Sequence, residues 1–146
     1  MMAAGAIPKD AAEAAEFVRL GLVEGHAYGV IGQAEVTGSD GRPAQLVLVR
    51  NPWGSYEWKG AFSDNSHLWT PAARQHLKAT LNWEPRDDGT FFMTIADFCN
   101  HFKIFFQCKY VDGYQFSHLL LPVLETEAIL AKVVVKTSGM YTIGLS

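Results

Sequence analysis

Two apolar stretches on either side of a glycine-rich turn constrain this chain more than any other feature. Residues 26–36 are rich in Tyr, Val, Ile and Gly, residues 45–50 form a largely β-branched apolar run, and Gly38-Ser39-Asp40-Gly41 separates them. Short apolar runs bounded by turn residues predict β-strands, so we expect an antiparallel hairpin. Its geometry places the start of the first strand beside the end of the second, which brings His26 close to Asn51.

A histidine held by an asparagine is a chemically distinctive pair. An Asn side-chain oxygen can orient an imidazole, and the two residue types are the second and third members of a Cys-His-Asn catalytic arrangement. Each residue also has a structural explanation. His26 fits a hydrogen-bonded histidine in a β-sheet core, and Asn51 precedes Pro52, a combination that favours turn initiation. From these residues alone, the structural explanation is favoured for His26.

The composition is that of one folded domain without a surface for polyanions. Of 146 residues, 49% are hydrophobic and 18% are charged, enough for one sizeable core. The formal net charge is −3 and the Lys and Arg residues are scattered singly, so we expect no nucleic-acid partner. No apolar run approaches the roughly 20 residues of a transmembrane segment, and residues 1–7 lack the pattern of a secretory signal.

The remaining segments predict a few short helices and strands around the hairpin, which makes the expected fold class α+β. Helices are expected over residues 10–20, 71–83 and 94–100, and strands over residues 91–93 and 103–110. In the first helix, the small side chains of Ala11, Ala14, Ala15 and Val18 are expected to form the packed face.

The two cysteines are not expected to be reactive. Cys99 and Cys108 have neither disulfide nor zinc spacing, which predicts a reducing, cytoplasmic location. We expect both to be small core hydrophobes rather than nucleophiles. The histidines other than His26 have no metal-ligand spacing; they are His67, His76, His101 and His118.

Four blocks of this sequence resemble the core of calpain-type cysteine proteases. They are Gly25-His26-Ala27-Tyr28, Arg50-Asn51-Pro52-Trp53-Gly54, Glu57-Trp58, and Asp88-Gly89-Thr90-Phe91-Phe92-Met93 with Asp97-Phe98. They follow the order of the family between about Gly21 and Cys108. The resemblance implies a papain-like fold, of which this chain is the C-terminal lobe with an antiparallel, barrel-like sheet.

The resemblance also implies roles for the residues at the hairpin ends. His26 corresponds to the general base, which takes the proton of the thiol and later protonates the leaving amine. Asn51 corresponds to the residue that holds the imidazole in the useful tautomer. Trp53 corresponds to a tryptophan beside the active site, where it shields the His-Asn hydrogen bond from water.

A calcium site outside any EF-hand is implied by the same resemblance. Glu57, Asp64 and Asp88 fall on its carboxylate ligands, and Arg86 falls on a position that supplies a backbone carbonyl. Calcium takes about six to eight oxygen ligands of these kinds. Thr90 stands where the family usually has another acidic residue, so we expect a low-affinity or vestigial site. Without the resemblance, the same acids fit a set of surface turn residues.

The chain changes character after Tyr110. Residues 111–113 begin a connector, and further strands are expected over residues 131–135 and 141–145. We therefore expect the protease lobe to occupy residues 1–110 and the connector and strands to occupy residues 111–146. The late strands either extend the same sheet or, by the resemblance, begin a following β-sandwich domain.

The nucleophile of the family is the missing part. It lies in a Gln-…-Gly-Asp-Cys-Trp segment upstream of the histidine, and no such segment precedes His26, so the chain alone is expected to be inactive. Two hypotheses follow. The chain is the C-terminal half of a calcium-dependent endopeptidase that acts on a protein substrate with a separate Cys-bearing lobe, or it is a catalytically dead module that binds a protein partner and calcium. In either case, an apolar lobe-docking face with Trp53 at its edge would favour self-association.

Overall fold

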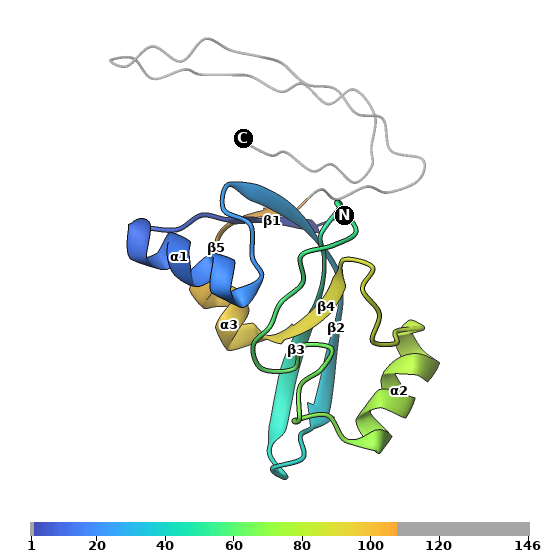
Figure 1. Ribbon diagram of the computed structural model, residues 1–146. Coiled ribbons are helices and arrows are strands. Elements are labelled where there is room, and N and C mark those ends of the chain that lie inside the picture. Colours follow the sequence, from blue (N-terminus) through green and yellow to red (C-terminus); the bar gives the residue numbers. More distant parts are fainter. Residues whose placement is uncertain (1, 108–146) are drawn as a thin grey trace, which may run out of the picture. The chain divides into compact units, whose positions relative to one another are not determined.

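The computed structural model describes residues 2–107, and the expectations for Cys108, for His118 and for residues 108–146 lie outside that range. Within it, the chain forms a five-stranded antiparallel sheet and three short helices (Figure 1), which confirms the α+β fold class. None of these helices has the length and hydrophobicity of a transmembrane span. The elements are β1 (Met2–Ala6), α1 (Ala11–Leu20), β2 (His26–Thr37), β3 (Pro43–Arg50), α2 (Pro71–Leu81), β4 (Thr90–Thr94), α3 (Ile95–His101) and β5 (Phe102–Gln107).

The predicted hairpin forms the middle of this sheet, whose strand order is β4-β3-β2-β1-β5. β2 and β3 pair along most of their length, and the pairing of β3 ends with Arg50 opposite Gly29. β2 starts earlier, at His26, which pairs with Ala6 of β1. The start of β2 and the residue after β3 therefore meet at one end of the sheet, as the hairpin geometry requires.

The sheet buries an apolar core on each of its faces. Side chains alternate along β3, so Val47 and Val49 join one core while Leu46 and Leu48 join the other. Phe17 of α1 packs in the first core and Leu77 of α2 packs in the second. Figure 1 accordingly shows α1 and α3 on one side of the sheet and α2 on the other.

The strand β1 was not predicted from the sequence. Its residues are Met, Ala and Gly, which carry little preference for strands, yet it hydrogen bonds to β2 on one side and to β5 on the other. Ala4 and Ala6 are completely buried in the first core. Pairing on both edges, rather than local propensity, accounts for this strand.

The helices begin at side-chain caps. Asp10, Thr70 and Thr94 each accept a hydrogen bond from the backbone N–H three residues later, as an N-cap residue does. The three predicted helices are thereby confirmed, with ends within a few residues of those expected.

Two predictions about burial were wrong. In α1, Phe17 and Leu20 are buried while Val18 is 76% exposed, because the two large side chains bury more apolar area than the alanine face would. On α3, Cys99 is exposed rather than in the core. Its neighbour Phe98 is the residue of this short helix that packs inward, and the next position turns away from the sheet.

Most of the predicted site residues lie on the long loop between β3 and α2. Two buried tryptophans hold this loop through their indole N–H groups. Trp58 donates to the carbonyl of Ala61 and Trp69 donates to the carbonyl of Ser63, each at 2.8 Å. The loop therefore has a defined conformation although it contains no helix or strand.

Candidate active site

The hairpin brings His26 and Asn51 into hydrogen-bond contact, with 2.8 Å between His26 Nε2 and Asn51 Oδ1. Asn51 is completely buried and His26 is half-buried. The predicted contact between the two side chains is confirmed, and the catalytic roles of these residues remain a prediction.

The hydrogen-bond network determines which way the Asn51 amide points. Its Nδ2 donates to the backbone carbonyls of Ser55, at 2.6 Å, and Tyr56, at 3.2 Å. Carbonyl groups accept only, so the nitrogen must face them and the oxygen must face the histidine. The same Oδ1 also accepts a hydrogen bond from the backbone N–H of Trp53 at 3.1 Å.

This orientation in turn selects the tautomer of His26. Because Asn51 Oδ1 is an acceptor, His26 Nε2 must carry the hydrogen of the 2.8 Å contact. In the neutral imidazole the other ring nitrogen, Nδ1, then carries the lone pair. The geometry thus prepares Nδ1 as a proton acceptor and keeps the ring in one orientation.

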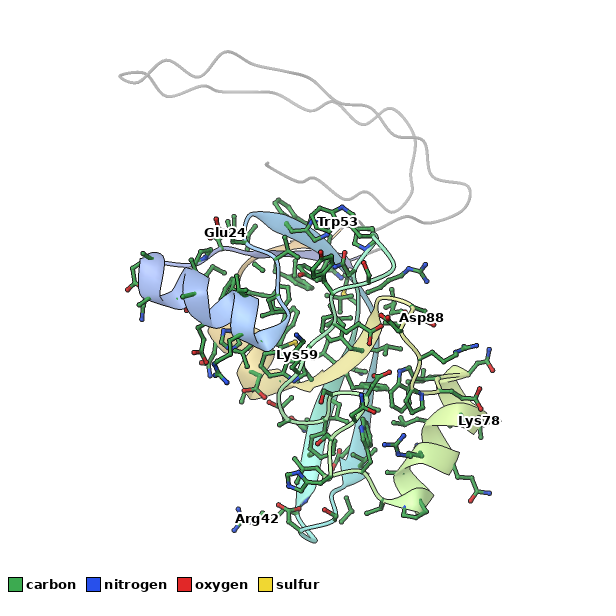
Figure 2. The ribbon with its side chains drawn as sticks, in the orientation of Figure 1. Glu24, Arg42, Trp53, Lys59, Lys78 and Asp88 are labelled. Carbon is green, nitrogen blue, oxygen red and sulfur yellow. The ribbon has the colours of Figure 1, made fainter. Side chains whose placement is uncertain are left out.

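Aromatic rings enclose the imidazole on two sides. The Trp53 indole lies 4.3 Å from the His26 ring, centroid to centroid, and is tilted by 42°. Tyr28 packs edge-to-face against it at 4.9 Å. Trp53 is nevertheless 59% exposed, so it covers the His26 ring from the solvent side. Figure 2 labels Trp53 at the edge of the domain.

Tyr28 is a supporting residue to which the sequence had assigned no role. Its ring is 1% exposed, and its hydroxyl accepts a hydrogen bond from the backbone N–H of Val23 at 2.8 Å. Burial raises the pKa of the Tyr28 phenol above its usual value. The hydrogen bond from Val23 therefore connects the segment before His26 to Tyr28, whose side chain is part of the core.

The predicted acidic residues lie on two loops near the pair. Glu57 Oε1 accepts hydrogen bonds from the backbone N–H groups of Asp88, at 2.9 Å, and Gly89, at 2.7 Å. Burial raises the pKa of Glu57, against the lowering effect of these two bonds. A single carboxylate thus links the loop after β3 to the loop before β4.

Asp64 is held through one of its two carboxylate oxygens. Its Oδ2 accepts the Arg86 backbone N–H at 2.7 Å, whereas the buried Oδ1 has no partner among the described residues. Burial and then the negative charge of Glu57 raise the pKa of Asp64 to about 7. A buried oxygen without a partner and a carboxyl crowded by like charges both indicate a place where a cation would be favourable.

The other predicted metal residues are near these two acids. Asp88 Oδ1 accepts the backbone N–H of Thr90 at 3.0 Å, and the Arg86 carbonyl accepts the backbone N–H of Asp88 at 2.9 Å. The Arg86 guanidinium lies 3.8 Å from Asp88. Among the described residues no three His, Cys, Asp or Glu side chains form a closed metal cluster. A calcium ion at these residues therefore stays a prediction.

An open hollow of about 1730 Å³ lies on the side of these acidic loops. Glu57, Asp64 and Arg86 are among the residues that line it, while His26 and Asn51 are not. Figure 2 labels Lys59 of its lining and, on the neighbouring loops, Trp53 and Asp88. The hollow therefore belongs to the acidic loops rather than to the His-Asn pair.

The comparisons with known proteins place these features in a family. Residues 1–109 match the family model described as calpain family cysteine protease. Calpain-14 of Homo sapiens is 44% identical over 93 residues, which cover 64% of this chain and 13% of that protein. Calpain-9 of Homo sapiens is 36% identical over 124 residues, which cover 83% of this chain and 16% of that protein. The chain therefore spans about an eighth of the length of the curated relatives that it matches.

Proposed function

Since the chain belongs to the calpain family of cysteine proteases, we propose that it supplies the histidine and asparagine of a Cys-His-Asn endopeptidase site. The observation that carries this proposal is the 2.8 Å contact between His26 Nε2 and a fully buried, fully hydrogen-bonded Asn51. The nucleophilic cysteine is proposed to come from a lobe outside this chain, and we propose a cytoplasmic location because neither cysteine has disulfide spacing.

The geometry supports a separate role for each of His26, Asn51 and Trp53. His26 Nδ1, which carries the lone pair, takes the proton of the incoming thiol, so that a thiolate attacks the peptide carbonyl. The resulting imidazolium then protonates the leaving amine. Asn51 keeps Nε2–H directed away from the substrate and stabilises the charged ring, while Trp53 limits the access of water to that hydrogen bond.

We also propose that the acidic loops bind calcium with low affinity. Glu57, Asp64 and Asp88 would supply carboxylates and Arg86 its carbonyl, and the cation would neutralise the mutual repulsion of the acids. The buried Asp64 Oδ1, which has no partner among residues 2–107, and the raised pKa of Asp64 support this proposal. Thr90 can offer a hydroxyl but no negative charge.

Tryptophan fluorescence tests the calcium proposal directly, because Trp58 follows Glu57 in the sequence. A saturable change at millimolar calcium, absent in Asp64→Asn, is expected. No change at that concentration would remove the metal proposal and leave the catalytic proposal standing.

Reconstitution with a nucleophile-bearing lobe of a relative tests the catalytic proposal. The full chain is fused to, or mixed with, that lobe, and hydrolysis of a fluorogenic peptide is measured. His26→Ala is expected to reduce turnover by about a thousandfold or more, since the members of a catalytic unit act together. The control is His76→Ala, which removes an exposed histidine of α2 and should retain activity.

The second hypothesis is a module that binds a protein partner without turnover. The exposed aromatic side chains beside the pair, Trp53 at 59% and Tyr56 at 63%, support a docking surface there. Equal hydrolysis by the wild-type chain and by His26→Ala in the reconstituted assay would reject the catalytic proposal and favour this one.

A further inference from the structure

The backbone of Asn51 is held from the β4 side of the sheet as well as from the hairpin. The β3–β4 ladder ends with the pair Arg50 and Thr90. One further hydrogen bond continues it, in which the Asn51 N–H donates to the Gly89 carbonyl at 2.7 Å. The position of Asn51 along the sheet is therefore set by Gly89.

Gly89 lies in close contact with the loop that carries Asn51. Its φ is +82°, which is a left-handed conformation that favours glycine. A Cβ added there would lie 2.6 Å from the Asn51 carbonyl oxygen and 2.8 Å from the Gly54 Cα. Both are backbone atoms, and Gly54 N–H donates to that same Asn51 carbonyl at 3.0 Å. These contacts therefore fix the position of Gly89 relative to the loop that carries Asn51.

The other side of Gly89 is fixed by Glu57. The Gly89 N–H donates to Glu57 Oε1 at 2.7 Å, and Glu57 directly follows Tyr56, whose carbonyl accepts from Asn51 Nδ2. The contacts thus form a closed circuit from the Asn51 backbone through Gly89 and Glu57 to the Asn51 side chain. Every link in it is a hydrogen bond or a covalent bond of the chain.

We propose that Gly89 is a positioning residue for the His-Asn pair, and that the Glu57 carboxylate holds Gly89 in place by accepting its N–H. This inference rests on the proposed catalytic function of Asn51. It assigns to Glu57 a role that needs the acceptor oxygen of the side chain rather than its charge, in addition to any role in binding a cation.

The first test compares two glycines of nearly equal conformation in the full chain. Gly41, in the hairpin turn, has φ +76°, and a Cβ there would meet nothing within 4 Å. Gly41→Ala therefore places an alanine in the same left-handed conformation as Gly89→Ala does, but its new Cβ contacts no other residue. Amide hydrogen exchange by NMR is measured for Asn51 and, as a reference, for Leu77 in α2.

We expect Gly89→Ala to lower the protection of the Asn51 amide at least about tenfold relative to Leu77, and to shift the side-chain resonances of Asn51 and His26. Gly41→Ala should change neither. Unaltered exchange and resonances in Gly89→Ala would overturn the proposal.

The second test separates hydrogen bonding from charge at Glu57 and does not depend on the folding of Gly89→Ala. In chelator, Glu57→Gln keeps an acceptor oxygen and should retain the Asn51 protection, whereas Glu57→Ala should lose it. Equal loss in both variants would overturn the hydrogen-bonded link.

The reconstituted peptidase completes the test. Gly89→Ala is expected to lower kcat about tenfold or more with little change in KM, because the new Cβ displaces Asn51, which orients His26. Failure of the wild-type reconstitution would reject the catalytic function alone, since the exchange measurements on the chain decide the positioning role without turnover.

Discussion

Replacement of Asp64 by asparagine should change the pH dependence of stability in a direction that the structure determines. Burial and the charge of Glu57 raise the pKa of Asp64 from 3.8 to about 7 in the folded chain. Between these values the folded state holds a proton that the unfolded state has released. The free energy of unfolding therefore falls as pH rises through this window, and the loss is complete above pH 7.

The size of the effect follows from the shift. A change of about three pKa units corresponds to about 4 kcal/mol, which is an upper bound. Asp64 is partly exposed to solvent, so screening reduces the net penalty to about 2 kcal/mol. Asparagine cannot ionise, and its Oδ1 can still accept the Arg86 N–H.

Urea unfolding followed by tryptophan fluorescence, in chelator, measures this difference. Relative to wild type, Asp64→Asn should gain about 2 kcal/mol of stability between pH 4 and pH 8. The control Glu24→Gln, which removes an exposed charge, should show no such gain. A stability difference between Asp64→Asn and wild type that stays constant from pH 4 to pH 8, or that falls, would refute the reasoning.

Three further outcomes are expected from urea unfolding at neutral pH. Asn51→Ala should cost about 2 to 4 kcal/mol, since it leaves buried partners of both the amide nitrogen and oxygen unpaired; a cost below about 1 kcal/mol would contradict the network. Leu77→Ala should cost about 3 kcal/mol by opening a cavity beneath α2, whereas the exposed neighbour Lys78→Ala should stay within about 0.5 kcal/mol, and equal costs would argue against the packing described. Thr70→Ala should cost about 1 kcal/mol, because it removes the N-cap hydroxyl that accepts the Ala73 N–H. Thr70→Ser should keep most of the wild-type stability, because its hydroxyl can accept the same bond; the opposite order of the two variants would exclude capping.

Local chemistry made much of the fold predictable. Turn residues bound the hairpin, and Thr70 and Thr94 precede helical patterns, so hydrogen bonds within a few residues determine these elements. The position of His26 opposite Asn51 followed from the antiparallel geometry alone. β1 was not predictable in this way, because its strand conformation depends on pairing with residues far away in the sequence.

The candidate site shows the same division between local and distant causes. A histidine and an asparagine at strand ends could be recognised in the sequence, and the family resemblance predicted Glu57 and Asp64 as calcium ligands. The role of Gly89 could not be found there, since Asp88-Gly89 is also an ordinary turn pair. Its significance comes from two close backbone contacts that only the folded chain creates.

The placement of β1 has a consequence for how the domain acquires its structure. Ala4 of β1 pairs with Tyr28 of β2 and with Phe105 of β5, so this short strand joins the two ends of the described chain. Closing so large a loop costs chain entropy before its contacts are gained, which slows assembly. We therefore expect the β2–β3 hairpin to form early. The insertion of β1 between β2 and β5 should come last and limit the folding rate.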